Sequence, residues 1–200
     1  MRGQPAPRVV IFAGPNGAGK TTHAELMLEA LGIQTFVNAD FIARGLSGRN
    51  TEAVNFEAGR IMLRRLQQLA AERADFAFES TLSSRSFAPF LRELREQGYR
   101  VAIHYFSLRS ASLATARVKL RVKLGGHNVP VETVKRRYGR SLANFFSLYQ
   151  ALADEWTLFD NSTGSAELIA SHNDQHTTVE DQRAWQKIQR HVAAHLNSPS

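Results

Sequence analysis

The sequence predicts an α/β fold in which a five-stranded, mostly parallel sheet carries helices on both faces. Short apolar runs alternate along the chain with longer stretches of helical periodicity, a pattern typical of right-handed βαβ units. The first apolar run enters a glycine-rich turn that leads directly into a helical pattern. The chain has 200 residues, of which 43% are hydrophobic, and this is enough for one hydrophobic core. We therefore expect a single domain over residues 1–200.

Five apolar runs have the length of strands. The first, RVVIFAG, is continuous and ends in glycine, as expected of a strand buried on both faces. The fourth, VAIHYFSL, is the clearest of the five. The second, third and fifth are shorter, and each runs into polar residues. We expect the strands at residues 8–14, 35–39, 76–78, 101–108 and 156–159.

The segments between these runs repeat apolar residues at helical spacing. The first places Ala24, Leu28 and Leu31 on one side of a helix and stops at Gly32. Ser110 can cap a later helix through its side-chain oxygen. We expect helices at residues 20–31, 51–73, 86–97, 110–124 and 131–153, and a polar surface helix at about 178–196.

Composition and charge narrow the class of protein. The chain has a formal net charge of +7 and no cysteine, which excludes disulfides and thiolate metal sites. No apolar run reaches the length of a membrane span or a signal-peptide core, so we expect a cytoplasmic protein without a membrane partner. Residues 100–140 contain ten Lys/Arg and one acidic residue, so this block attracts an anion.

Residues 14–21, GPNGAGKT, match the phosphate-binding motif G-x-x-x-x-G-K-[ST] between a strand and a helix. The glycines let backbone N–H groups turn toward a phosphate, and the following helix points the positive end of its dipole at the same charge. The alternative is a glycine-rich turn with a capping threonine, but such a turn rarely has Lys-Thr directly after the last glycine. We predict an ATP site with Mg²⁺, formed by Gly14, Pro15, Asn16, Gly17, Ala18, Gly19, Lys20, Thr21 and Thr22, with Thr21 as the metal ligand.

Residues outside this cradle decide the chemistry, because hydrolases, switches and kinases all use the motif. No later strand ends in the Asp-Glu pair of motor and transporter ATPases, and no N-K-x-D guanine motif occurs. A kinase needs a carboxylate near the γ-phosphate to accept the proton of a substrate hydroxyl. Asp40 follows the second strand, at the edge of the sheet where the cradle lies, and we favour it as the catalytic base. The alternative is that Asp40 caps a short helix over residues 41–44.

The third strand runs into Glu79-Ser80-Thr81, at the same edge of the predicted sheet. Glu79 could bind a substrate hydroxyl or a metal-bound water, and Thr81 could contact the acceptor. The alternative for Glu79 is an exposed carboxylate at the end of a strand. We assign Asp40, Arg44, Glu79 and Thr81 to substrate binding.

Residues 110–140 predict a helical lid. Arg117 and Arg121 lie four apart on one predicted helix, and three more arginines at positions 136, 137 and 140 lie on the next, beyond a Gly-Gly segment. Two arginine-bearing helices joined by a flexible loop can close over a triphosphate and stabilise the charge of the transferred group. The alternative is a solvated basic face. We expect Arg117 and Arg121 to act in catalysis with Lys20 and Asp40, and Arg136 to bind ATP.

These segments together resemble the zeta toxin family of small P-loop kinases. The resemblance covers residues 8–163 and depends on the cradle, NADF at 38–41, FAFESTL at 76–82, GGHNVP at 125–130, RRYGRS at 136–141 and DNS at 160–162. It implies ATP-dependent phosphorylation of a hydroxyl, which in the family belongs to UDP-N-acetylglucosamine. It also implies that Asp40 is the base, that Glu79 and Thr81 bind substrate, that Asn161 lies near the adenine, and that an antitoxin protein is a partner.

One position departs from the family. The toxins carry an arginine two residues after the threonine of E-x-T, whereas this chain has Ser83 there and its nearest arginine is Arg85. The acceptor therefore stays open, and so does an ATPase or switch that acts on a protein partner without phosphotransfer. We do not expect a nucleic-acid partner, because the basic block lacks the interleaved aromatic residues of a base-stacking surface.

Overall fold

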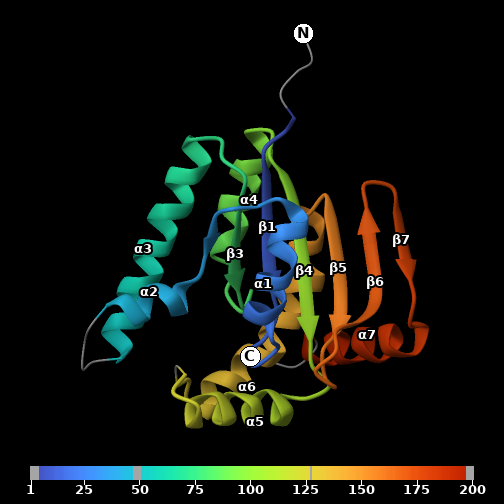
Figure 1. Cartoon of the computed structure of the whole chain (residues 1–200). Helices are drawn as coiled ribbons and strands as arrows, with labels where there is room; N and C mark the ends of the chain where they lie inside the picture. The colour runs from blue at the N-terminus through green and yellow to red at the C-terminus, as the bar shows by residue number, and fades with distance from the viewer. Residues whose placement is uncertain (1–4, 47–50, 127, 197–200) are drawn as a thin grey trace.

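The computed structural model describes residues 5–46, 51–126 and 128–196. Within these residues, one seven-stranded sheet has the order β2-β3-β1-β4-β5-β6-β7 (Figure 1). The first five strands pair in parallel, and the last two form an antiparallel extension of β5. The strands are β1 (Arg8–Ala13), β2 (Phe36–Val37), β3 (Phe76–Ser80), β4 (Arg100–Ser107), β5 (Glu155–Asp160), β6 (Glu167–Asn173) and β7 (His176–Val179).

The predicted fold class and the mostly parallel sheet are confirmed, but the count of five strands is wrong because β6 and β7 are added. β6 has the sequence ELIASHN, in which only Ile169 and Ala170 are buried. A strand at the edge region of a sheet can keep polar residues toward water, so it lacks the apolar run that marks a central strand. The prediction of a tail helix at 178–196 is wrong at its start, because residues 178 and 179 belong to β7 and the helix begins at Gln182.

The helices lie where the periodicity predicts them, with one addition and one subdivision. The addition is the short α2, and the predicted helix at 131–153 changes from α-helical to π-helical and then 3₁₀ geometry before β5. The helices are α1 (Lys20–Leu31), α2 (Ala39–Gly45), α3 (Thr51–Ala71), α4 (Phe87–Glu96), α5 (Ala111–Lys123), α6 (Val131–Asn144), η1 (Phe145–Tyr149), η2 (Gln150–Leu152) and α7 (Gln182–Leu196). Among the described helices, none has both the length and the apolar character that crossing a membrane requires.

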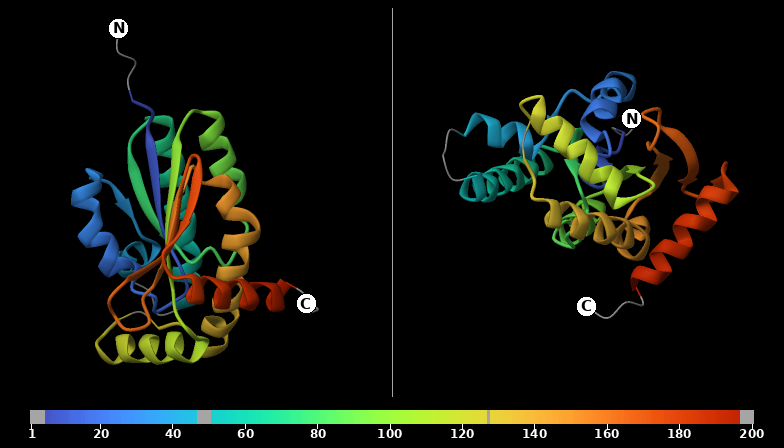
Figure 2. Two further views of the ribbon diagram at one scale, coloured as in Figure 1. Left: turned by 90° about the vertical axis from the view of Figure 1, so that its right-hand side faces the viewer. Right: turned by 90° about the horizontal axis from the view of Figure 1, so that it is seen from below.

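Helices cover both faces of the sheet (Figure 2). Successive residues of β1 point to opposite faces, so Val10 and Phe12 pack with α1 and the helices α5 and α6, whereas Val9 and Ile11 pack with α3, α4 and η1. The parallel strands end at the edge that α5 and α6 cross (Figure 1). This edge is where an α/β sheet of this kind binds its ligands.

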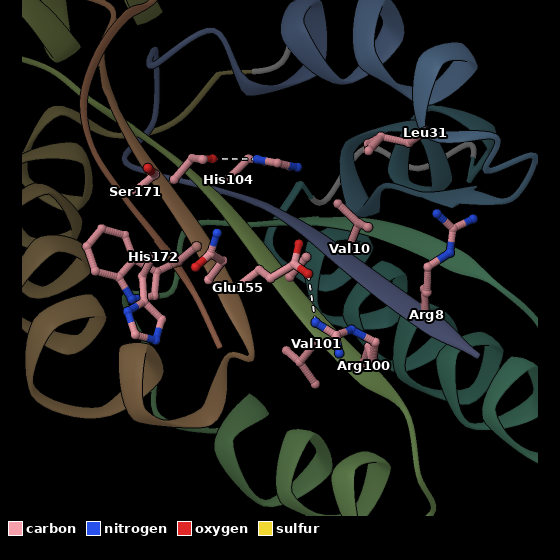
Figure 3. Close-up of a pocket in the computed structure, with 13 residues that line it drawn as sticks. Arg8, Val10, Leu31, Arg100, Val101, His104, Glu155, Ser171 and His172 are labelled. Carbon is pink, nitrogen blue, oxygen red and sulfur yellow. Dashed lines mark hydrogen bonds and ion pairs between the residues drawn. The ribbon is translucent and has the colours of Figure 1, made fainter. Parts of the chain in front are cut away.

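A cavity of about 300 Å³ lies at the other end of the sheet, beside the first residues of β1, β4 and β5 (Figure 3). Arg8, Arg100 and Glu155 line it, together with His104. None of the residues predicted for the functional site lines this cavity. We call this cavity, which lies away from the predicted site, the reference cavity.

Candidate active site

The cradle between β1 and α1 depends on glycines that no other residue can replace without movement. Gly14 has a φ of 137°, and a Cβ at this position would lie 2.2 Å from the carbonyl oxygen of Phe106. Gly17 has a φ of 78°, and a Cβ there would lie 2.9 Å from the carbonyl oxygen of Ala114 in α5. The cradle is thus held between β4 on one side and α5 on the other, with its backbone free of side chains where a phosphate would approach.

Lys20 begins α1 and points into the cradle. Its side chain is only 5% exposed, and its Nζ lies 3.0 Å from the carbonyl oxygen of Pro15 and 3.4 Å from Oε1 of Glu79. The next residue, Thr21, donates a hydrogen bond of 2.6 Å to Oε2 of Glu79. Glu79 at the end of β3 therefore faces the two cradle side chains that the motif assigns to phosphate and metal.

Asn38, which was not among the predicted site residues, links Glu79 to Asp40. Its Nδ2 donates to Oε2 of Glu79 at 2.9 Å, and its Oδ1 accepts from the backbone N–H of Asp40 at 2.7 Å. Asn38 is the N-cap of α2, so the alternative in which Asp40 caps this helix is wrong. The carboxylate of Asp40 is left available to the cleft. The signal that could have found Asn38 is its place directly after β2.

The donors around Thr21 fit a magnesium ion. The Thr21 hydroxyl and the Glu79 carboxylate are oxygen donors 2.6 Å apart, beside a phosphate-binding backbone. Mg²⁺ takes few protein ligands and completes its shell with water and substrate phosphates. Among the described residues, no group of three His, Cys, Asp or Glu side chains could hold a metal alone.

Asp40 lies among arginines of the two helices that cross the sheet. Nη1 of Arg121 lies 3.5 Å from Oδ2 of Asp40, and Arg137 lines the same cavities as Asp40. Burial lowers the pKa of the Arg137 guanidinium, the neighbouring Arg136 lowers it further, and Asp40 opposes both effects. An additional anion beside Arg137 would be favourable for the same reason.

Other predicted lid residues occupy different surroundings. Nη2 of Arg117 donates to the carbonyl oxygen of Ser162 at 3.0 Å, and its Nη1 lies 3.5 Å from that of Gly17, so Arg117 contacts the cradle. Arg136 is exposed and lies 3.4 Å from the hydroxyl of Thr133. Arg44 stands over the ring of Phe41 at 5.6 Å and lines a separate recess with Arg117 and Arg121.

The Gly-Gly segment between α5 and α6 has a defined structural role. Gly125 has a φ of 83°, and the N–H of Gly126 donates to the carbonyl oxygen of Arg121 at 2.9 Å. This arrangement closes the C-terminus of α5, which is what a left-handed glycine commonly does. His127 of the family segment lies outside the described residues.

Asn161, which directly follows β5, contacts the backbone of the cradle. Its Nδ2 donates to the carbonyl oxygen of Ala18 at 2.8 Å, and the same atom lies 2.5 Å from where a Cβ of Gly19 would be. Its Oδ1 is buried and has no hydrogen-bond partner among the described residues.

Thr22, the last of the residues predicted for the ATP site, is exposed on the first turn of α1.

The loop after β3, residues 81–84, is clamped by α6 and η1. Ser141 donates to the carbonyl oxygen of Thr81, Asn144 to that of Leu82 at 2.9 Å, and Tyr149 to that of Ser84 at 2.6 Å. Leu82 is 1% exposed and has a φ of 50°, which is rare for a residue with a side chain. The clamp holds this loop in a conformation that its own backbone does not favour.

One cavity of about 420 Å³ brings most of the predicted catalytic and substrate residues together. Lys20, Asp40, Glu79, Thr81 and Arg121 line it, whereas Arg44 and Arg117 do not. The part of the cavity that α3 lines was not predicted from the sequence. Its residues are Asn55, Phe56, Gly59, Arg60, Met62 and Leu63.

The zeta toxin family model matches residues 1–174. An uncharacterized protein of Haemophilus influenzae is 30% identical over 131 residues, which are 66% of this chain and 92% of that protein.

Two solved structures share the fold. The AvrRxo1-ORF1:-ORF2 structure with ATP has a TM-score of 0.76 and 17% identity, over 91% of this chain and 63% of that one, so this chain spans less than two thirds of its length. The PezAT chromosomal toxin-antitoxin system of Streptococcus pneumoniae has a TM-score of 0.58 and 15% identity, over 98% and 90% of the two chains. Because the family model covers most of its length, the chain belongs to the zeta toxin family.

Proposed function

We propose that this protein is an ATP-dependent kinase that transfers the γ-phosphate to a hydroxyl of a small molecule. The observation that carries the proposal is the cavity that Lys20, Asp40 and Glu79 share at the carboxyl edge of the sheet. The cradle residues 14–22 would bind the phosphates, with Mg²⁺ held by Thr21 and Glu79. When bound, the metal ion would neutralise charge on the phosphate oxygens.

The chain's own residues account for the transfer as follows. The acceptor hydroxyl oxygen attacks the γ-phosphorus, the bond from that phosphorus to the β,γ-bridging oxygen breaks, and ADP leaves. Asp40 takes the proton of the hydroxyl, and Nη1 of Arg121 lies 3.5 Å from its Oδ2. Lys20 and Arg121 stabilise the negative charge that spreads over the transferred group.

A UDP-amino sugar is the acceptor that family membership favours, and the cavity of about 420 Å³ has room for a sugar ring. Thr81 and the amide of Asn38 supply hydrogen-bonding groups beside Asp40. Ser83, which bonds Thr81 at 2.8 Å, stands where the family carries an arginine, so the second half of the acceptor is recognised differently in this chain.

The Asp40→Asn variant tests the proposal. We expect ATP affinity to stay within about threefold of the wild type, because Asp40 is outside the cradle, while transfer from labelled ATP falls by about 10³-fold or more. The acceptors are a panel of UDP-sugars, nucleosides and aminoglycosides. Transfer at the wild-type rate by Asp40→Asn would contradict the assignment, and ATP hydrolysis without any acceptor product would support an ATPase.

We also propose that an antitoxin protein binds this chain. The support is family membership and the fold shared with a chain of the PezAT toxin-antitoxin system. Co-expression with the product of the adjacent reading frame should yield a stable complex on size-exclusion chromatography, and failure of that protein to bind would contradict this partner.

A further inference from the structure

Gly59 in the middle of α3 has no role that the chain itself explains. Glycine is among the poorest helix formers, so its presence inside a long helix calls for a reason. A Cβ at Gly59 would meet no atom within 4 Å, and the residue does not have a positive φ. Among the glycines of the described residues, Gly45 at the last position of α2 also lacks a close neighbour and a positive φ, but only Gly59 combines these properties with a place in the interior of a helix. In α6, by contrast, a Cβ at Gly139 would lie 2.7 Å from the ring of His195.

The surroundings of Gly59 point to a ligand outside the chain. Phe56 and Leu63 lie three residues before and four residues after it, so all three share one face of α3. Both side chains line the same cavity as Gly59, and they remain 72% and 41% exposed. Phe56 and Leu63 flank the bare helix backbone at Gly59, and Arg60 lines the cavity next to it. We call Phe56, Gly59 and Leu63 the α3 slot.

The same cavity also has polar lining. Asp40, Glu79 and Thr81 line it, and Glu79 connects it to the cradle through Thr21. A molecule that fills the cavity therefore meets both the apolar side chains of the α3 slot and these polar groups. A ring that carries hydroxyl groups at its edge has both kinds of surface, whereas a flexible chain must lose more conformational entropy to present them.

We propose that Gly59 is a specificity-determining residue whose missing side chain lets the face of an acceptor ring lie against α3. Phe56 and Leu63 hold the two sides of the ring, and the hydroxyl to be phosphorylated reaches Asp40 across the cavity. This inference rests on the proposed kinase function for the role of Asp40. It adds the part of the acceptor that the enzyme recognises, a ring face and not only a hydroxyl.

The test is the Gly59→Ala variant, with Gln67→Ala as the matched control. Gln67 is an exposed residue of the same helix and does not line the cavity. Gly59→Ala should raise the Tm by a few degrees, because alanine favours the helix and meets no neighbour. It should leave the KM for ATP unchanged and raise the KM for the ring acceptor about tenfold, with kcat changed less than threefold. Gln67→Ala should change neither KM.

The probes are UDP-N-acetylglucosamine, N-acetylglucosamine, uridine and the linear polyol sorbitol. Binding of each to wild type and Gly59→Ala is also followed by saturation-transfer NMR, which needs no turnover. If no ring compound binds the wild type, or if Gly59→Ala binds it equally well, the inference is wrong. If a ring compound binds the wild type and loses binding in Gly59→Ala, but no phosphate is transferred, the α3 slot stands and the proposed kinase function fails.

Discussion

The two walls of the cleft are built in different ways. The cradle wall is one continuous stretch, residues 14–21, in which backbone groups would bind the phosphates and the single lysine is 5% exposed. The acceptor wall gathers side chains from α2, α3, β3 and the two helices α5 and α6, and its Phe56 is 72% exposed. A site formed by backbone groups needs closely spaced glycines in one stretch of the chain. A site formed by side chains can combine residues from distant segments. The two walls should therefore respond differently to substitution.

The largest effect is expected from Gly14→Ala, which disrupts the cradle wall. A Cβ would lie 2.2 Å from the carbonyl oxygen of Phe106, and the φ of 137° is unfavourable for alanine. We expect ATP affinity to fall by about 100-fold or more and the free energy of unfolding to fall by about 3 kcal/mol. Isothermal titration with ATP and urea denaturation measure the two quantities.

Gly32→Ala is the control for backbone strain alone. Gly32 has a φ of 66° but no atom within 4 Å of a Cβ, so the change should cost about 1 kcal/mol and leave ATP affinity unaltered. If Gly14→Ala behaves like Gly32→Ala, the close approach of β4 does not matter to the cradle.

A smaller effect, confined to the acceptor wall, is expected from Asn144→Ala. The change removes the hydrogen bond to the carbonyl oxygen of Leu82 and frees the loop that carries Thr81. We expect the acceptor KM to rise about tenfold while ATP affinity stays the same, with a loss of about 1–2 kcal/mol in the free energy of unfolding. Steady-state kinetics with both substrates separates these outcomes.

Tyr99→Phe is the control, because it also removes a side-chain hydrogen bond to a carbonyl group, but away from the cleft. The Tyr99 hydroxyl lies 3.0 Å from the carbonyl oxygen of Ala74. It should reduce stability without changing the acceptor KM. An equal rise in KM for both variants would mean that the loop responds to global stability and not to its clamp.

The smallest effect on the cleft is expected from His104, at the reference cavity of Figure 3. Burial lowers the pKa of His104 to about 4, and Glu155 only partly opposes this shift. The unfolded chain therefore binds a proton that the folded chain does not, between pH 6.5 and about 4. Stability from this group is present above pH 6.5 and is lost as the pH falls toward 4, by up to about 3 kcal/mol.

Urea denaturation across this pH range measures the loss in the wild type and in His104→Phe, whose pH dependence should be flatter. ATP affinity and acceptor KM at pH 7.5 should be the same in both proteins. Identical pH profiles would show that His104 does not titrate as proposed, and a change in either substrate constant would couple this end of the sheet to the cleft.

The elements that carry local signals could be predicted from the sequence. The apolar spacing of the helix at 20–31 and the stop at Gly32 predict its observed bounds, and in the structure Gly19 and Gly32 both adopt left-handed backbone at its ends. Ser110 was predicted as a cap, and its Oγ accepts from the N–H of Leu113 at 3.1 Å. The cradle could also be predicted from a local signal, because its glycines lie close together in one short stretch of the chain.

What could not be predicted depends on contacts between distant segments. Gly59 and Phe56 are ordinary helix positions in the sequence, and only the folded chain shows that they line the same cavity as Glu79 of β3. Asn38 donates a hydrogen bond to the carboxylate of Glu79, 41 residues away, and this contact is visible only in the folded chain. The structure also shows that Asn38, and not Asp40, caps α2. β6 was not predicted because most of its residues are polar or exposed, so it lacks a continuous apolar run. Its pairing with β5 is a contact that only the folded chain shows.

The clamp on residues 81–84 has a consequence for exchanging parts between relatives. The three carbonyl groups of this loop are bonded by side chains 60 to 65 residues further along the chain. A loop transplanted alone from a relative would arrive without these partners and lose the left-handed Leu82. The helix that supplies the first two of them also carries Arg137. Chimaeras that alter acceptor choice should therefore exchange residues 79–86 and 137–149 as one module.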